Sequence, residues 1–370
     1  MTQKYIFIHL NLYLRLGTQN FLEEEFNSAI EDIKKRYPDK TILLFDIFEH
    51  TSYLEESHLN LLLKVQDIME AFQHPYYFVL DTHINTHLHH HINNLLELDW
   101  SMMITYYFTV IVGHPALQKP NPDSHKALYL MGKGEKFHRI GILKMFYESN
   151  NLDKLHWSFK NPNSVVKIIR EKFFKYYDDE HFTDFLRTCT REIDSQLDPG
   201  AVVEGSSFSG LGFPYDISVY EQTGFSIISE SWVNLPYHFI TEKTWRTIAN
   251  SHPFVLVAQR HNFEWLSNNG YETFTRYFPI PNYYDTYDQT FLIEGVVANA
   301  LYMNRELSTN RSFYDELLTH SQQNKIKFYK TAKQQIINFL SELNQDKEFL
   351  LHIIRFHNQF QLYDKNLDHH

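Results

Sequence analysis

The chain has 370 residues, 43% of them hydrophobic, and this length predicts two domains because a domain usually spans about 100–200 residues. Its 30 Phe and 24 Tyr, against 12 Gly and 12 Pro, exclude a disordered or fibrous protein. The single cysteine, Cys189, excludes an intrachain disulfide and a cysteine-based zinc site.

The formal net charge is −11, and much of the imbalance lies in residues 1–125, which hold 8 Lys and Arg against 16 Asp and Glu. This acidic segment disfavours nucleic acid as a partner, although it leaves room for a local basic groove. The N-terminal apolar stretch is interrupted by His9, Asn11 and Arg15, and no later run approaches the roughly 20 apolar residues of a membrane span. We therefore predict a soluble cytoplasmic protein without a membrane span.

The first third of the chain alternates short apolar runs with longer amphipathic ones. The order is strand, helix, strand, helix, strand, followed by a further apolar run: 5–10, 21–35, 41–47, 59–72, 76–81 and 103–112. This rhythm predicts an open parallel sheet, whose strands carry functional groups at their carboxyl ends. Asp46, Glu49 and Asp81 follow such runs, and each is a candidate general base.

A proline-rich segment at Gly113–Ser124 predicts the domain boundary, because its three prolines continue neither a helix nor a strand. Residues 1–125 then form an N-terminal α/β domain, 126–325 a second α/β domain, and 326–370 C-terminal helices.

The second domain repeats the strand–helix pattern. We expect strands at 127–131, 225–229 and 254–258, and helices at 137–149, about 242–250, about 262–268, 291–303, 313–343 and 348–360. Helical spacing also occurs at 165–177 and 184–197, within a stretch to which the pattern assigns no role.

The densest chemical signal is the segment ITEKTWRTIANSHPFVLVAQRHNFE at residues 240–264. Thr241 is a candidate N-cap that places Glu242 and Lys243 in the first helical turn. A lysine opposes the partial positive charge of a helix N-terminus, and an anionic ligand such as a nucleoside diphosphate would resolve this conflict. Glu242 would then accept hydrogen bonds from ribose hydroxyls. The alternative is an exposed Glu242–Arg246 pair with a solvated Lys243.

The segment TEKTWRTIANSHPFVLVAQRHNFEWL resembles the C-terminal motif of the α-1,3-fucosyltransferases, and more closely the glycosyltransferase-like proteins of bacteriophages and giant viruses. The upstream FSIISESW resembles the strand that carries a Glu before that motif. The resemblance covers about residues 126–300. It implies ribose and diphosphate contacts for Glu242 and Lys243 and a place near the sugar for Glu230, and we include Arg246 among the donor-binding candidates.

A second segment, ALYLMGKGEKFHRIGILKMFYES, resembles the strand and His-Arg helix that open the donor domain of the phage-type proteins. The resemblance implies that Arg139 is a second diphosphate contact, with Lys133 on the preceding turn. Relatives carry more arginine and a proline in this turn. The alternative is a helix N-terminus with ordinary surface charges.

The His-rich stretch DTHINTHLHHH spaces His83, His87 and His91 for one helical face, a pattern that binds metals when further ligands are present. With no Glu or Cys partner at a fixed spacing, we expect a polar loop facing the acceptor and no metal. The sequence also lacks G-x-S-x-G, P-loop and strand-following G-x-G-x-x-G motifs, which disfavours hydrolases and Rossmann dehydrogenases.

These observations predict two facing Rossmann-like α/β domains of the glycosyltransferase B (GT-B) type, with the C-terminal helices packing across the cleft. The expected activity is transfer of a sugar from a nucleotide-sugar donor to an acceptor hydroxyl, without a metal or other cofactor. Inversion of configuration is implied by the resemblance alone, as is a host cytoplasm if the protein is viral. The alternatives are a non-catalytic nucleotide- or glycan-binding protein of the same fold, and a glycosyltransferase acting on modified viral DNA.

Overall fold

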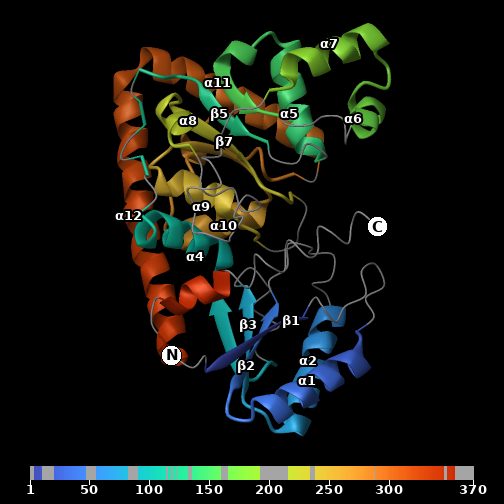
Figure 1. Cartoon of the computed structure of the whole chain (residues 1–370). Coiled ribbons are helices and arrows are strands. Elements are labelled where there is room, and N and C mark those ends of the chain that lie inside the picture. Colours follow the sequence, from blue (N-terminus) through green and yellow to red (C-terminus); the bar gives the residue numbers. More distant parts are fainter. Residues whose placement is uncertain are drawn as a thin grey trace. The chain divides into compact units, whose positions relative to one another are not determined.

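A computed structural model gives the architecture of the chain (Figure 1). The residues that it describes are 4–10, 21–46, 56–81, 91–113, 116–117, 120–121, 123–131, 136–159, 166–191, 216–233, 238–286, 288–345 and 348–354, without the side chains of 46, 56–58 and 81. The protein is an α/β protein with two four-stranded sheets, and this confirms the predicted class and the presence of two sheets. Among the described helices, none is long and apolar enough to cross a membrane.

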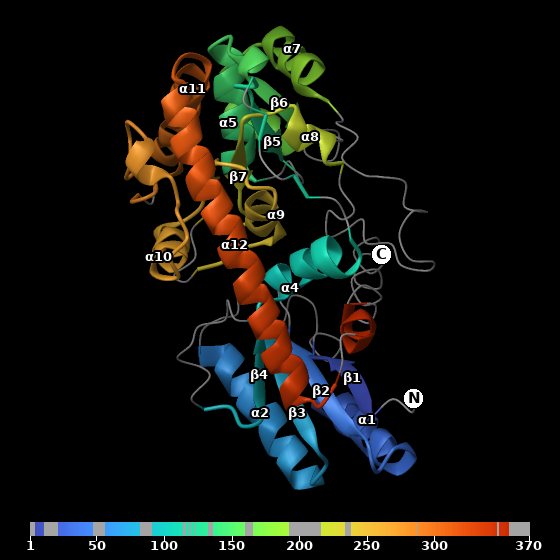
Figure 2. The same cartoon turned by 90° about the vertical axis from the view of Figure 1, so that its left-hand side faces the viewer.

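The chain divides into two compact units. The first unit comprises residues 1–104, 205–207 and 333–370, and the second unit comprises 105–204 and 208–332. Helix α12 (Arg311–Glu342) therefore contributes residues to both units, and Figure 2 shows it as one continuous helix.

The division at Ile104 and Thr105 differs from the boundary expected at Gly113–Ser124. The physical reason is that the proline-rich segment is hydrogen-bonded to the second unit. The Leu117 amide donates to Asn250 at 2.7 Å, and the Tyr314 hydroxyl donates to the Pro120 carbonyl at 2.6 Å. The described residues Leu117 and Pro120 are thus bonded to the second unit.

The first unit contains a parallel sheet whose strands follow chain order. The strands are β1 (Tyr5–His9), β2 (Thr41–Asp46), β3 (Tyr76–Asp81) and β4 (Leu95–Leu98). Helices α1 (Glu23–Arg36) and α2 (Glu56–Phe72) connect the first three strands. The apolar run at 103–112 is helical, within α4 (Trp100–Tyr106) and the π-helical turn Tyr107–Ile111, and β4 was not expected.

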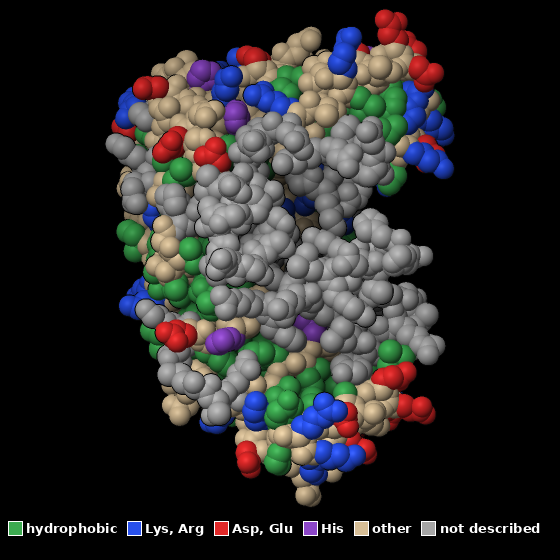
Figure 3. Space-filling model, viewed as in Figure 1, with side chains coloured by type: hydrophobic (Ala, Val, Ile, Leu, Met, Phe, Trp, Pro, Cys, Tyr) green, Lys and Arg blue, Asp and Glu red, His purple; other side chains and the backbone are tan. Residues whose placement is uncertain are grey.

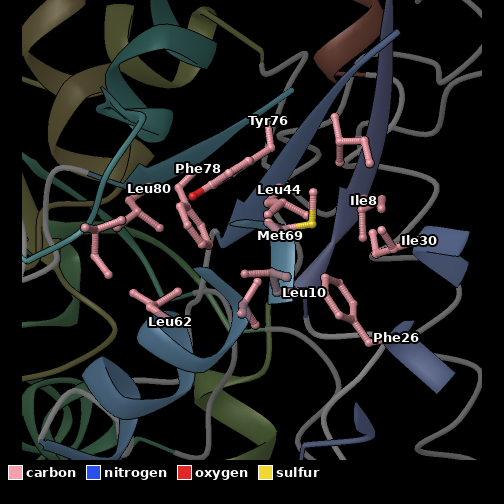
Figure 4. Close-up of a cluster of buried hydrophobic side chains, with 13 residues drawn as sticks. Ile8, Leu10, Phe26, Ile30, Leu44, Leu62, Met69, Tyr76, Phe78 and Leu80 are labelled. Atoms are coloured by element: carbon pink, nitrogen blue, oxygen red, sulfur yellow. The ribbon is translucent and has the colours of Figure 1, made fainter. Parts of the chain in front are cut away.

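Alternate strand residues of this sheet form two apolar faces. One face packs with α1 and α2 in a core that includes Ile8, Leu44 and Phe78 of the strands and Phe26 and Met69 of the helices (Figure 4). On the other face, the Phe349 ring lies 5.2 Å from the Tyr5 ring and 5.7 Å from the Phe7 ring. The second face of this sheet is thus packed against a residue near the C-terminus.

The second unit contains a parallel sheet of order β6-β5-β7-β8. Its strands are β5 (Ala127–Leu130), β6 (Leu155–Ser158), β7 (Phe225–Ser229) and β8 (Phe254–Val257). Its main helices are α5 (Phe137–Glu148), α6 (Val166–Phe173), α7 (Asp179–Cys189), α8 (Ser218–Glu221), α9 (Glu242–Ala249), α10 (Arg260–Asn268) and α11 (Gln289–Thr309). Strand β6 was not expected, whereas β5, β7, β8, α5 and α9 match the predicted segments within a residue or two.

Helices cover both faces of this sheet. The Tyr129 hydroxyl of β5 donates to the Arg139 carbonyl of α5 at 3.0 Å, which places the odd-numbered residues of β5 on the α5 face. Helix α11 packs closely on α5 at Gly141, where a Cβ atom would lie 2.5 Å from Cδ1 of Ile293. Helix α9 lies on the opposite face, because its residues border a recess together with Leu128 and Leu130, the even-numbered residues of β5.

Candidate functional site

The strand order of the second sheet reverses between β5 and β7. The connection through α5 leads from β5 to β6 on one side, whereas β7 and β8 lie on the other side. Strands β5 and β7 pair only over Ala127–Phe225 and Leu128–Ser226, whereas β7 and β8 pair over four positions. The carboxyl ends of β5 and β7 therefore separate. Ligands of open α/β sheets bind at such a reversal, outside the carboxyl ends of the strands.

Helix α9 begins at this point and is capped as the sequence predicts. The Thr241 hydroxyl accepts a hydrogen bond from the Lys243 amide, and it donates to Oε2 of Glu230 at 2.5 Å. The other carboxylate oxygen of Glu230 accepts from the Thr241 amide at 3.0 Å and from the Thr244 hydroxyl at 2.6 Å. Glu230 thus joins the end of β7 to the first turn of α9.

Glu230 is fully buried, and its carboxylate accepts three hydrogen bonds from Thr241 and Thr244. Burial raises the pKa of this carboxyl, while nearby Lys243 and the bonds from the two threonines oppose the increase. The sequence resemblance implies a place near the sugar for this side chain. The structure shows this carboxylate bonded to the first turn of α9, and the implied place near the sugar stays a prediction.

Lys243 and Glu242 form a partly buried ion pair in the first turn of α9, with Nζ 2.9 Å from Oε1. Burial alone would raise the pKa of Glu242, but Lys243 and Arg246 together hold it below its ordinary value. The Lys243 side chain is only 19% exposed, and its ammonium also donates to the Thr241 hydroxyl at 3.3 Å. This geometry contradicts the alternative of a solvated Lys243 beside an exposed Glu242–Arg246 pair.

A small recess, open in part to solvent, lies between α9 and the sheet. Its enclosed part has room for about one water molecule. Two cations, Lys243 and Arg246, and the hydroxyl-bearing residues Ser226 and Thr247 border the recess. The remaining lining residues are mainly apolar: Leu128, Leu130, Tyr220, Ile227 and Ile228, with Ser229 at the end of β7. The recess therefore offers positive charge beside an apolar wall.

The start of α5 is bound to the end of β7. His138 donates from Nε2 to the Glu230 carbonyl at 3.0 Å, and the buried Arg139 guanidinium donates to the Ser229 carbonyl at 3.3 Å. Burial and the neighbouring Arg139 lower the pKa of His138 to about 3, so this imidazole is neutral at physiological pH. The Lys136 ammonium lies 3.8 Å from the centre of the Trp232 ring. Arg139 thus bonds to the end of β7, and its expected contact with a diphosphate stays a prediction.

The structure brings five of the predicted donor-site residues together around β7 and α9: Arg139, Glu230, Glu242, Lys243 and Arg246. In the first unit, Asp46 and Asp81 end the neighbouring strands β2 and β3, whose carboxyl ends lie at one sheet edge. Their side chains are outside the described part of the chain, as are Glu49, Lys133, His83 and His87. His91 is exposed. No group of three metal-ligating side chains occurs among the described residues.

Three residues at the recess were not singled out from the sequence. Ser226, Thr247 and His252 are buried, and the Ser226 hydroxyl lies 2.7 Å from Nδ1 of His252. The available signal was weak, because a serine inside an apolar strand and a histidine before a proline are both common in cores. The contact between Ser226 and His252 joins residues that are 26 positions apart, so only the fold reveals it.

Comparisons of the chain with protein-family models, with curated proteins and with solved structures find no match. The geometry of the second unit is therefore the main physical basis for a functional proposal.

Proposed function

We propose that the protein is a glycosyltransferase that binds the diphosphate of a nucleotide-sugar donor at the N-terminus of α9. The observation that carries this proposal is the position of Lys243 and Arg246 beside the recess where the order of the second sheet reverses. The positive end of a helix dipole and cationic side chains both favour a phosphate group. The resemblance of residues 241–266 to fucosyltransferases selects a nucleotide sugar among phosphate ligands.

In the proposed reaction, an acceptor hydroxyl oxygen bonds to the anomeric carbon as the bond from that carbon to the diphosphate oxygen breaks. The acceptor proton passes to a general base, for which Asp46, Glu49 and Asp81 stay the candidates predicted from sequence. Negative charge develops on the departing diphosphate, and Lys243 and Arg246 stabilise it. Fixed cations of this kind perform the role that a metal ion has in other transferases.

The alternative of a transferase acting on DNA receives less support from the surface charges. On the face drawn in Figure 3, Lys and Arg side chains are interspersed with Asp and Glu among the described residues. A protein that binds duplex DNA gains most of its affinity from cations gathered along the phosphate backbone.

The test is calorimetric titration of the protein and of Lys243→Ala with UDP, GDP, ADP and dTDP. Loss of one charge-assisted hydrogen bond of about 1.5–3 kcal/mol weakens binding by about 10- to 150-fold. Lys144→Ala is the matched control, because Lys144 also forms a partly buried pair with a glutamate, Glu148, at 2.6 Å. Binding should persist in excess EDTA.

Unchanged affinity of Lys243→Ala for every nucleotide, or an equal loss in Lys144→Ala, would contradict the assigned phosphate position. Loss of binding in EDTA that manganese restores would contradict the metal-independent reaction.

A further inference from the structure

Two of the hydroxyl-bearing residues that border the recess, Ser226 and Thr247, have their hydroxyl protons engaged within the protein. Nε2 of His252 lies 3.0 Å from the Thr223 carbonyl, which accepts hydrogen bonds only, so Nε2 carries the proton of the neutral ring. Nδ1 is then an acceptor, and the Ser226 hydroxyl donates to it at 2.7 Å. Burial lowers the pKa of His252 to about 4, so this arrangement holds at neutral pH.

Thr247 is engaged in the same way. Its hydroxyl donates to the Lys243 carbonyl one turn earlier in α9, at 2.9 Å. Ser226 and Thr247 therefore present only oxygen lone pairs to a group that enters the recess. The Lys243 and Arg246 side chains, which also border the recess, present only N–H donors.

Acceptors and donors at the same recess determine which chemical group binds there. A phosphate oxygen without a proton has no donor for Ser226 or Thr247, and its charge would lie against their lone pairs. A hydroxyl group both donates to such an acceptor and accepts from a cation. The enclosed space also matches a hydroxyl in size, since it has room for about one water molecule.

We infer that the recess receives a sugar hydroxyl of the bound ligand, with Ser226 as its hydrogen-bond acceptor and His252 as the residue that orients Ser226. The inference rests on the proposed function, in which the phosphate of the same ligand lies outside the recess at the start of α9. The ligand class is accordingly a phosphorylated sugar, either the ribose of a nucleotide or the sugar to be transferred. Inorganic phosphate would interact with Lys243 and Arg246 but would offer no hydrogen-bond donor to Ser226 or Thr247.

The experiment compares hydroxylated and deoxy ligands by ligand-observed NMR titration of the full chain. One arm uses ribose 5-phosphate with its 2-deoxy and 3-deoxy analogues, and the other uses glucose 1-phosphate with its 2-deoxy and 3-deoxy analogues. Inorganic phosphate serves as the ligand without a sugar. We expect one deoxy analogue to bind roughly three- to tenfold more weakly than its parent, as loss of one ordinary hydrogen bond implies. The arm that shows the loss identifies the source of the hydroxyl.

Ser226→Ala should abolish this discrimination by weakening the parent sugar phosphate to the level of its deoxy analogue, while leaving inorganic phosphate binding unchanged. The matched control is Ser251→Ala, which also removes a buried serine hydroxyl near His252 but does not border the recess. His252→Gln should reduce the discrimination and leave phosphate binding intact, because the Ser226 hydroxyl then loses its fixed orientation.

Equal affinity of every deoxy analogue and its parent, with phosphate binding that depends on Lys243, would overturn the assigned hydroxyl position and leave the proposed function standing. Discrimination that survives in Ser226→Ala would have the same meaning. If neither phosphate nor any sugar phosphate binds, the inference and the phosphate position both fail.

Discussion

The two sheets of this protein are both parallel and four-stranded, yet their strand orders differ. In the first sheet the order β1-β2-β3-β4 follows the chain, and α1 and α2 pack on the same face. In the second sheet the order β6-β5-β7-β8 reverses, and α5 and α9 lie on opposite faces. Connections between parallel strands are right-handed, so only a reversal sends successive helices to opposite faces. The comparison teaches that similar strands can produce different arrangements of helices, and that the recess beside α9 lies in the sheet whose order reverses.

The proposed reaction needs a general base, and its three candidates lie at or just after strands of the first sheet, whose order does not reverse. We expect one of Asp46→Asn, Glu49→Gln and Asp81→Asn to lower the rate of sugar transfer by about 10²–10⁴-fold, because general-base catalysis contributes that much. Nucleotide binding should stay at the wild-type level. Transfer assays and calorimetry on the same preparations check both expectations, with Asp67→Asn on the exposed side of α2 as the control. Wild-type rates in all three variants would place the base elsewhere.

Removal of one large core side chain from each unit tests whether nucleotide binding depends on the second unit alone. Trp245 of α9 and Phe78 of β3 are both fully buried, so alanine at either position should lower the free energy of unfolding of its own unit by about 3–5 kcal/mol. Only Trp245→Ala should also weaken nucleotide binding, because Trp245 packs α9 against Phe328 and Tyr271.

Scanning calorimetry and ligand titration provide the two measurements. The control is Ile326→Ala, whose side chain is 70% exposed and should change stability by no more than about 0.5 kcal/mol. Equal loss of nucleotide binding in Trp245→Ala and Phe78→Ala would remove the distinction between the units.

The smallest expected effects concern two glutamates of the second unit with opposite pKa shifts. The pKa of Glu230 is raised by burial, so its ionisation reduces the stability of the folded state as the pH rises from about 4.3 toward that raised value. Although burial opposes it, the pKa of Glu242 is lowered by Lys243 and Arg246. Its stabilising contribution is therefore present above about pH 4.3 and is lost as the pH falls toward the lowered value.

Relative to wild type, Glu230→Gln should therefore become more stable as the pH rises, and Glu242→Gln should become less stable. Urea unfolding followed from about pH 3 to pH 8 measures both trends in the second unit, the Glu242 trend at the acidic end. Parallel pH profiles for the two variants would contradict the opposite pKa shifts of Glu230 and Glu242.

Local signals in the sequence were sufficient for β7 and α9. Strand β7 is a continuous apolar run, and the Thr241 cap and the spacing of Trp245 and Ile248 are readable within a few residues. Strands β4 and β6 are four residues long, LLEL and LHWS, and only pairing with β3 and β5 makes them strands. Such pairing depends on distant residues, which periodicity does not report.

Long-range contacts also account for what the sequence did not reveal about the site. The charged residues Glu242 and Lys243 were found because their conflict with the helix dipole is local. The engagement of Glu230 with Thr241 and Thr244, and of Arg139 with the Ser229 carbonyl, depends on the fold. The sequence marked these charged residues as candidates for one site. The structure shows that Lys243 and Arg246 border the recess, whereas Glu230 and Arg139 bond to neighbouring elements.

The contact of Phe349 with Tyr5 and Phe7 has a consequence for synthesis of the chain. The first strand leaves the ribosome long before Phe349, and one face of its sheet stays without this packing until the C-terminal residues follow. The second unit draws its described residues from a single intervening stretch, 105–332, and does not depend on either end. During translation the second unit can therefore complete its core first, and the unit that begins the chain completes its core last.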